Sequence, residues 1–593
     1  MKKLSLLSIE GTDFIKQVID VTLGREKADL SIIHATLLNV YTGELLPDYS
    51  ISVKGDWIAY IGQDPEGTIG KNTNIIDARG KYVIPGLIDG HTHIADCFYN
   101  PSEFLRFAMI GGTTTVVTET IEPFPILGCK GLVEFLASLK EQPIKIFATV
   151  PAMVSTSKAV RALSNKELKR LLKRDDILGL GESYWQAILQ EPEGFLPDFM
   201  ETLQSGKRLE GHSAGAKGKK LLAYTAHGIT SCHEPVNPEE VLERLRLGLY
   251  VMVREGSIRK DLASISRIRD RDVDLRRLIL VSDGISPTEI VEKGYMENIV
   301  RKAIECGFEP AKAIQMATLN VAEYFQLDGI TGGIVPGKHA DMLIISDIRT
   351  IKPEYVISRG KVIAQEGRLL SLPRRHRFSS RARNSVFLTG ELNPSNFAIQ
   401  IRERVSDVRI RVIDQVTDLV TKEYIASVPV TGGRIGSDVT RDLLKVAAID
   451  RANAPGRMFV GLIRGFRLTG GAIASSSAWD TSDIIVIGAN DEDMALAVNR
   501  IHSMQGGAVV SCEGKILEEI PLPIFGLMSD LPMEDLTRKL MDVRNAIKTL
   551  GAPFADPLRT LITLTGAAIP FIRICEEGLV DIKTGKKRNL ICD

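Results

Sequence analysis

The sequence has little cysteine, few aromatic residues and no excess of either charge, and each shortage excludes a class of protein. Only seven of its 593 residues are cysteines, and they are scattered without a CxxC pair. This pattern argues against a disulfide framework and suits a reducing compartment. Seventy-four Lys and Arg balance 74 Asp and Glu. The chain therefore lacks a bulk attraction to nucleic acid or to an anionic membrane surface.

Long hydrophobic runs are also missing. No uninterrupted apolar stretch approaches the roughly 20 residues that a membrane span requires. The basic start of the chain is followed by Glu10 and Asp13, which interrupt the apolar segment of a signal peptide. These observations predict a cytoplasmic protein with no membrane partner.

The length exceeds what one hydrophobic core usually supports, so two to four domains are expected. Short β-like runs occupy residues 29–80 behind a helical start at 1–24, and together 1–80 would form an N-terminal helix and the first part of a β-sandwich. Its second part is predicted at 336–370. The remaining parts are a linker with five arginines at 371–385 and a C-terminal α/β domain at 386–593.

The middle region, residues 81–335, alternates eight short apolar strands with amphipathic helices. Such alternation over about 250 residues is typical of a (β/α)₈ barrel, and barrel enzymes keep their active sites where the strands end. The fold class predicted for the whole chain is therefore α/β: a TIM-like barrel with a split small β-sandwich and an additional C-terminal domain.

Polar residues follow the apolar strands at those ends. His91 and His93 lie at the carboxyl end of the first predicted strand, residues 82–91, and the later strands end in Glu182, His212, His233 and Asp283. A single buried histidine or aspartate is usually a core residue or a helix cap, but six at matching strand ends are hard to explain that way. Four imidazoles and two carboxylates suit two divalent metals, with one carboxylate able to bridge them.

The same residues resemble the amidohydrolase superfamily and, within it, the adenine deaminase family of bacteria and archaea. The resemblance extends from about residue 30 to the end of the chain. It includes PGLIDGHTH (85–93), GTTTVV (112–117), EGHSAGAKGKKLLAY (210–224), SCHEPVNPEEVLERLRLGLYVMVREGS (231–257), GAIASSSAWD (471–480) and PLPIFGLMSDLP (521–532).

The resemblance implies hydrolytic deamination of adenine to hypoxanthine and ammonia by a metal-bridged hydroxide, as in purine salvage. His91 and His93 would bind the first metal, and His212 and His233 the second. Glu182 would bridge them, and Asp283 would bind the first metal and transfer protons. Mn²⁺ or Fe²⁺ would be the cofactor, with Zn²⁺ as another possibility. A free purine base would be the partner of a homo-oligomeric enzyme.

Five positions near this chemistry depart from the family pattern: Ala95, Ile121, Gly284, Trp479 and Ser482. They leave two alternatives open, namely the same site acting on another aminopurine or a cyclic amide, and a catalytically silent paralogue that binds a purine. Trp479 could stack on a planar base or belong to a core or an interface.

Two further polar residues lie near the ends of the sixth and seventh predicted strands. Glu234 would point away from His233 if the strand continued, which implies a supporting or turn role. Arg254 ends the seventh strand and could reach a substrate or form a structural ion pair. The base-flipping zinc deaminases of nucleic acids use H-x-E with P-C-x-x-C. Both patterns are missing here, so no nucleic-acid partner is expected.

Overall fold

The computed structural model describes residues 11–402 and 405–592. Of the helix predicted at 1–24, residues 1–10 lie outside the described residues. The described part of it is α2 (Thr12–Thr22), which buries Val18 and Val21 against the neighbouring sheet.

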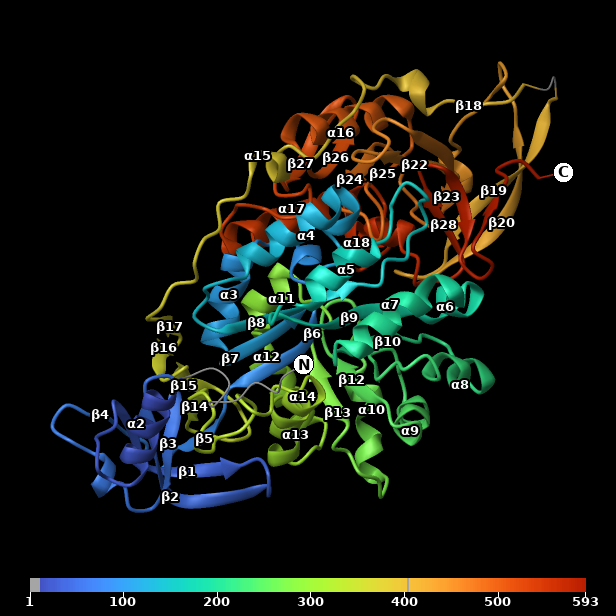
Figure 1. The fold of residues 1–593 in the computed structure, drawn as a ribbon. Helices are drawn as coiled ribbons and strands as arrows, with labels where there is room; N and C mark the ends of the chain where they lie inside the picture. The colour runs from blue at the N-terminus through green and yellow to red at the C-terminus, as the bar shows by residue number, and fades with distance from the viewer. Residues whose placement is uncertain (1–10, 403–404, 593) are drawn as a thin grey trace.

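Two segments far apart in the sequence pair in one nine-stranded sheet at one end of the molecule (Figure 1). β5 (Tyr82–Pro85) runs antiparallel to β14 (Met342–Ile345), with Ile84 opposite Leu343. The other strands are β1 (Leu30–Asn39), β2 (Glu44–Lys54), β3 (Trp57–Gly62), β4 (Asn74–Asp77), β15 (Pro353–Ser358), β16 (Lys361–Gln365) and β17 (Arg368–Leu369). The start and the end of the middle region are thus held side by side.

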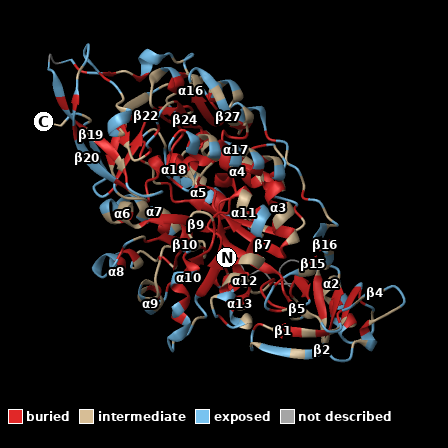
Figure 2. Cartoon of the chain, turned by 180° about the vertical axis from the view of Figure 1, so that it is seen from behind, coloured by how far each residue is buried: buried red, intermediate tan, exposed pale blue. Residues whose placement is uncertain are grey.

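The middle region contains two parallel sheets. One is formed by β6 (Leu87–Thr92), β7 (Thr113–Thr118), β8 (Lys145–Pro151), β9 (Ile177–Tyr184) and β10 (Arg208–His212), and the other by β11 (Ser231–Cys232), β12 (Tyr250–Arg254) and β13 (Leu278–Val281). Every residue of β6, β7, β9 and β13 is buried, as Figure 2 shows for the centre of the molecule. Burial of both faces suits β13 (LILV), which is apolar throughout, whereas β7 (TTTVVT) buries threonines beside its valines.

The edges of the two sheets are joined by backbone hydrogen bonds. The N–H of Thr230 donates to the carbonyl of Leu209 at 3.0 Å, and the N–H of Asp283 donates to that of His91 at 3.0 Å. The parallel strands therefore curl around a shared core.

The first predicted strand, residues 82–91, is divided at Gly86 between β5 and β6. A Cβ at Gly86 would lie 2.3 Å from Thr114 Oγ1. The close approach of the backbone to β7 therefore requires glycine, and at this point the chain passes from one sheet to the other.

Helices follow the parallel strands and cover them. They are α3 (Pro101–Ile110), α4 (Phe124–Ser138), α5 (Asn165–Leu172), α6 (Trp185–Gln190), α7 (Pro192–Gln204), α8 (Lys219–Thr225), α9 (Pro238–Arg246), α10 (Leu262–Ile265), α11 (Pro287–Lys293), α12 (Met296–Glu305), α13 (Pro310–Met316) and α14 (Leu319–Tyr324).

A buried ion pair links the parallel strands to the nine-stranded sheet. Lys145 Nζ, at the start of β8, lies 2.6 Å from Asp341 Oδ2, just before β14, and both side chains are buried. We expect Asp341→Asn to lower the free energy of unfolding by about 3 kcal/mol at pH 7, because a buried ammonium loses its partner. Urea denaturation checks this, with the exposed carboxylate variant Glu44→Gln as control.

The difference in the free energy of unfolding between the wild type and Asp341→Asn should depend on pH. Burial opposes ionisation of Asp341, but Lys145 outweighs it and holds the pKa of the carboxyl below its ordinary value. The stabilisation is therefore present above about pH 4 and is lost as the pH falls through the depressed pKa. A loss of stability in Asp341→Asn that is as large at pH 3 as at pH 7 would contradict this account.

The C-terminal part contains an eight-stranded sheet in the order β20-β19-β23-β22-β25-β24-β26-β27. α16 packs on one face, where it meets Ile449 and Ala474, and α17 lies with Val446 and Ala448 on the other. The elements are β18 (Ile399–Gln400), β19 (Asp407–Gln415), β20 (Thr421–Pro429), β21 (Arg434–Ile435), β22 (Leu444–Asp450), β23 (Met458–Arg464), β24 (Ala472–Ser475), β25 (Asp483–Gly488), α16 (Asp491–Met504), β26 (Gly507–Cys512), β27 (Lys515–Pro521), α17 (Met533–Thr549), α18 (Pro557–Ile562), β28 (Ile572–Cys575), β29 (Gly578–Asp581) and β30 (Lys586–Arg588).

This C-terminal part lies over the carboxyl ends of the parallel strands (Figure 1). In the loop after β8, Ser155 Oγ donates to the carbonyl of Asp480 at 2.6 Å, and Thr156 Oγ1 donates to that of Thr565 at 3.0 Å. The segment that ends at Asp480 is thereby fixed above the strand ends.

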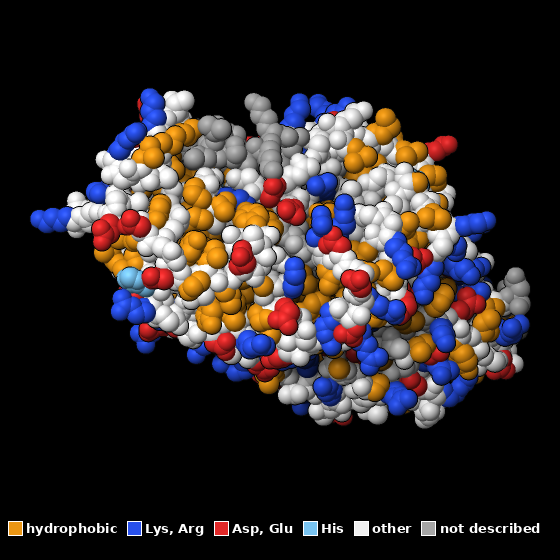
Figure 3. All heavy atoms as spheres, turned by 90° about the horizontal axis from the view of Figure 1, so that it is seen from below, with side chains coloured by type: hydrophobic (Ala, Val, Ile, Leu, Met, Phe, Trp, Pro, Cys, Tyr) orange, Lys and Arg blue, Asp and Glu red, His pale blue; other side chains and the backbone are white. Residues whose placement is uncertain are grey.

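The arginine-rich segment 371–385 contacts both parts. Arg374 donates to the carbonyls of Ala137 and Lys140, and Arg383, at the end of α15 (Ser380–Arg383), pairs with Asp530. On the face seen in Figure 3, basic and acidic side chains are interspersed. None of the helices in residues 11–402 and 405–592 combines the length and the hydropathy that crossing a bilayer requires.

Candidate active site

Five of the predicted residues surround one point at the carboxyl ends of β6, β9, β11 and β13. Glu182 Oε1 lies 3.6 Å from His91 Nε2, 3.5 Å from His93 Nε2 and 3.4 Å from His233 Nε2. Asp283 Oδ1 lies 3.4 Å from His91 Nε2 and 3.5 Å from His93 Nε2. Glu182 is thus placed between the first pair of histidines and His233.

The sixth residue, His212, belongs to an adjoining group. Its Nε2 lies 3.3 Å from Glu234 Oε1, and His233 Nε2 lies 3.4 Å from the same oxygen. Glu234 was expected to point away from His233 if the strand continued, and this condition is not met. β11 ends at Cys232, so the alternation of a strand no longer applies to the residues that follow it. Both side chains turn toward the site.

The donor atoms fit divalent cations. Ligand atoms of His91, Glu182, His233 and Asp283 lie within 4.8 Å of one another, and so do those of His212, His233 and Glu234. His91 Nε2 is buried without a hydrogen-bond partner among the described residues. The contacts of 3.3–3.6 Å between these imidazole nitrogens and carboxylate oxygens are longer than ordinary hydrogen bonds. Imidazole nitrogen and carboxylate oxygen are ligands that Mn, Fe and Zn share.

The pKa shifts of His91 and Glu182 also indicate a cation site. Burial opposes protonation of His91, but Asp283 and Glu182 outweigh it and raise the pKa of the imidazole well above its ordinary value. Burial also opposes ionisation of Glu182, but His93 and His233 outweigh it and lower the pKa of the carboxyl. The carboxylates therefore draw positive charge into the site, as a cation site requires.

A second layer of carboxylates holds the histidine rings. Glu122 Oε1 lies 2.6 Å from His93 Nδ1, while Glu210 Oε2 and Glu119 Oε1 lie 3.3 and 3.6 Å from His91 Nδ1. Such partners fix the tautomer and leave Nε2 free to bind a metal. Burial raises the pKa of Glu119 to about 8. Sequence reasoning missed Glu210, although it lies two residues before His212 on the same face of β10.

We expect Glu122→Gln to weaken metal affinity by roughly 10- to 100-fold, because the amide cannot replace the charged partner of His93. Competition with a metal-binding dye measures the affinity, and Glu193→Gln, which removes an exposed carboxylate, is the control. An unchanged affinity in Glu122→Gln would show that His93 does not depend on this carboxylate.

Arg254 forms a structural set of ion pairs. Its guanidinium contacts Glu234, lies 2.9 Å from Asp261 Oδ2, and lies 3.4 Å from Asp283 Oδ2. The arginine therefore holds Glu234 and Asp283 on one side of the site, and it also lines the cavity described next.

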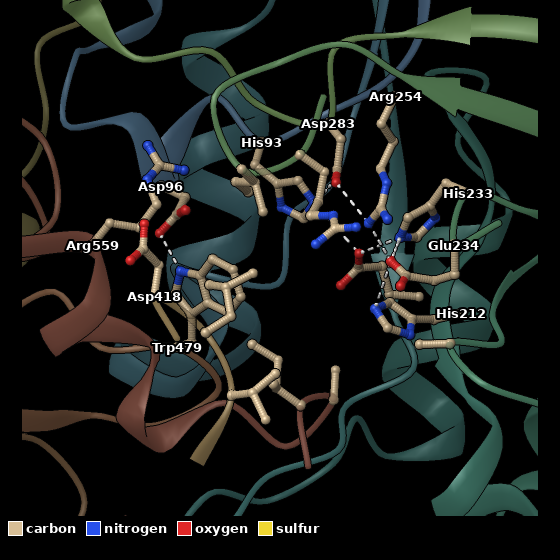
Figure 4. A pocket seen from close by; sticks show the side chains of 18 of the residues that line it. His93, Asp96, His212, His233, Glu234, Arg254, Asp283, Asp418, Trp479 and Arg559 are labelled. Carbon is tan, nitrogen blue, oxygen red and sulfur yellow. Dashed lines mark hydrogen bonds and ion pairs between the residues drawn. The ribbon is translucent and has the colours of Figure 1, made fainter. Parts of the chain in front are cut away.

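A cavity of about 820 Å³ opens between these groups and the C-terminal part (Figure 4). Its wall includes Ile121, Trp479 and Asp480. Tyr184 Oη lies 3.2 Å from both Glu182 Oε2 and Asp480 Oδ1. It therefore connects the C-terminal part to Glu182, one of the candidate metal ligands. The C-terminal part therefore supplies one side of the site.

The five positions that depart from the family pattern have different surroundings. Ile121 and Trp479 line the cavity, whereas Ala95 is fully buried. Gly284 has a φ of 86°, a conformation that glycine adopts without strain. Ser482 Oγ donates to Asp450 Oδ1 at 2.8 Å, within the C-terminal sheet. Only two of the five thus lie on the cavity wall.

Fold and site together define the class of the protein. Residues 82–363, which hold all six predicted ligands, match the Amidohydrolase family, and residues 418–586 match the adenine deaminase C-terminal domain. An adenine deaminase of Moorella thermoacetica is 36% identical over 584 residues, covering 97% of this chain and 98% of that protein. One of Cenarchaeum symbiosum is 34% identical, covering 96% and 94%. The chain belongs to the adenine deaminase family.

Proposed function

We propose that this protein hydrolyses free adenine to hypoxanthine and ammonia, a reaction of purine salvage. The observation that supports this most directly is the similarity to adenine deaminases over 97% of the chain. The gathering of His91, His93, Glu182, His212, His233 and Asp283 at one cavity agrees with it.

For the architecture we propose a closed (β/α)₈ barrel over residues 81–335. The hydrogen bonds at both seams between the parallel sheets support closure. The remaining layout is the predicted one: a small β-sandwich built from 1–80 and 336–370, a linker at 371–385 and a C-terminal domain at 386–593. Cytoplasmic location and assembly into a homo-oligomer stay predictions.

For the cofactor we propose two divalent cations, Mn²⁺ or Fe²⁺, with Zn²⁺ as the alternative. His91, His93 and Asp283 would hold the first and His212 and His233 the second, with Glu182 between them and Glu234 beside the second. Bound divalent cations lower the pKa of water toward neutrality and polarise the groups that they contact.

The chain's own residues then position and protonate the reactants. Asp283, kept ionised beside His91, His93 and Arg254, accepts a proton from the attacking water as its oxygen bonds to C6 of adenine. The electron pair of the C6–N1 double bond moves to N1, which takes this proton from the carboxyl. The carboxyl then passes the remaining hydroxyl proton to the leaving nitrogen as C6=O forms. The C6–N bond breaks, and ammonia and hypoxanthine leave. Water and adenine together account for every atom of the products.

A second candidate is the same hydrolytic site acting on another aminopurine. The presence of Ile121 and Trp479 on the cavity wall favours it, since altered wall groups change what a pocket recognises. A cyclic amide as substrate and a catalytically silent paralogue are the remaining alternatives from the sequence.

The test is the release of ammonia and the appearance of hypoxanthine from adenine, with protein reconstituted with Mn²⁺ under reducing, anaerobic conditions. We expect rapid conversion with the reconstituted protein and none with metal-free protein. Conversion of another aminopurine but not of adenine by the metal-loaded protein would establish the second candidate in place of the first.

A further inference from the structure

Three side chains occupy the end of the cavity that faces away from His212, His233 and Arg254. In Figure 4, Asp96, Trp479 and Arg559 lie together across the open space from these residues. The indole Nε1 of Trp479 donates to Asp96 Oδ1 at 2.9 Å. Asp96 lies three residues after His93, a candidate metal ligand, whereas Trp479 belongs to the C-terminal part. The hydrogen bond therefore joins two of the sequence segments that depart from the family pattern.

The indole ring is held in place. The N–H of Trp479 donates to the carbonyl of Ile562 at 3.1 Å, and Thr565 Oγ1 donates to the carbonyl of Trp479 at 2.6 Å. Gly566 lies against the ring, because a Cβ at this glycine would be 3.3 Å from Trp479 Cε3. A fixed aromatic ring on a cavity wall is suited to stacking on a planar base.

The two charged groups beside the indole have unused hydrogen-bonding capacity. Asp96 is 6% exposed, and Oδ1 is its oxygen that accepts the hydrogen bond of Trp479. Arg559 Nη1 is buried without a partner among the described residues, and the ion pair of Arg559 with Asp556 is long, at 3.7 Å. An acceptor and a donor are thus available on the same part of the wall.

Burial, together with the charge of Glu122, raises the pKa of Asp96 to about 7, and Arg559 opposes this rise. Among the protein groups, the ionised form of Asp96 therefore has few hydrogen-bond donors around it. A ligand that brings an N–H group would supply one.

We propose that Asp96, Arg559 and Trp479 recognise the edge of a free purine base that lies opposite C6. Asp96 accepts the ring N9–H, Arg559 donates to N3, and Trp479 stacks on the rings. In a purine, N3 lies across the six-membered ring from C6. N9 is bonded to C4, the neighbour of N3, so N3 and N9 share one edge of the base. A base whose C6 faces Glu182 and Asp283 directs this edge toward the opposite wall.

This recognition rests on the proposed function and deepens it by naming the substrate class: 6-substituted purines with an unsubstituted N9. Nucleosides and 9-alkylpurines lack the N–H that Asp96 accepts. They also leave the carboxylate of Asp96 with Trp479 as its hydrogen-bond donor but without the second donor that N9–H supplies, and a poorly paired buried charge is costly.

The test is calorimetric binding of hypoxanthine and 9-methylhypoxanthine to the Mn²⁺-reconstituted protein. We expect the wild type to bind hypoxanthine about 10- to 100-fold more tightly, the range of a hydrogen bond to a charged group. Asp96→Ala should lose this factor for hypoxanthine and bind both compounds alike. Asp272→Asn, which removes an exposed carboxylate that does not line the cavity, should behave as the wild type.

Several results would overturn the proposal. They are equal binding of the two compounds by the wild type, no binding of hypoxanthine, and undiminished discrimination in Asp96→Ala, which would make the methyl effect purely steric. If Asp96→Ala does not fold, Asp96→Asn is used, and it should bind hypoxanthine at least 10-fold more weakly than the wild type. Wild-type affinity in this variant would also overturn the proposal.

Failure of the proposed reaction can be separated from failure of this recognition. Adenine turnover is measured on the same preparations. Binding of hypoxanthine that depends on Asp96, without turnover of adenine, would support the recognition and refute the reaction. Rapid turnover of adenine in Asp96→Ala, with wild-type KM, would refute the recognition and leave the reaction intact.

Discussion

Asp283→Asn is expected to retain the fold and most of the bound metal but to lose turnover of adenine by about 10³-fold. General acid–base catalysis contributes roughly 10²- to 10⁴-fold, and an amide cannot accept the proton of the attacking water. Asp283 lies 3.4–3.5 Å from His91 and His93, and the amide oxygen of asparagine can occupy the same place. The loss should therefore fall on kcat rather than on metal content.

Steady-state kinetics and elemental analysis of one preparation separate the two effects. Asp272→Asn is the matched control, because it makes the same change at an exposed carboxylate that does not line the cavity. Near wild-type kcat in Asp283→Asn would refute the assignment of Asp283 as the proton-transfer group. A kcat that falls only in proportion to lost metal would make Asp283 a ligand without a proton-transfer role.

Glu182→Ala is expected to lower metal affinity by more than 100-fold and to abolish activity at ordinary metal concentrations. Its Oε1 lies within 3.6 Å of three imidazole nitrogens, so its removal affects both groups of ligands. The effect should exceed the roughly 10- to 100-fold loss that is typical of outer partners such as Glu122.

Metal content after dialysis against a weak chelator measures this loss, with Glu122→Gln as the graded comparison and Glu193→Gln as the exposed control. Full metal occupancy in Glu182→Ala would refute the bridging position. A loss in Glu182→Ala no larger than that in Glu122→Gln would show that Glu182 acts only as an outer partner.

The sequence predicted the six ligand candidates because each follows an apolar strand, and the ends of parallel strands meet in space. Residues beyond the regular part of a strand escaped this reasoning. Glu234 turns inward because β11 ends at Cys232, and the position where a strand ends is the least certain feature of a sequence-based assignment. Glu210 could have been found, since it shares the face of His212 on β10.

Contacts between distant segments could not be predicted from local patterns. The hydrogen bond between Trp479 and Asp96 joins residues 383 positions apart, and no periodicity reports such a contact. Trp479 could have belonged to a core or an interface, and its place on the cavity wall follows from the packing of the C-terminal part over the strand ends. The division of residues 82–91 at Gly86 likewise depends on the approach of β7.

Titration of the metal-free protein with Mn²⁺, while the formation of hypoxanthine from adenine is followed, tests the central claim most directly. The account predicts no activity without metal and a rise that saturates at about two equivalents per chain, in line with two-cation catalysis. Full activity in the metal-free protein, or no conversion of adenine with two equivalents bound, would contradict it.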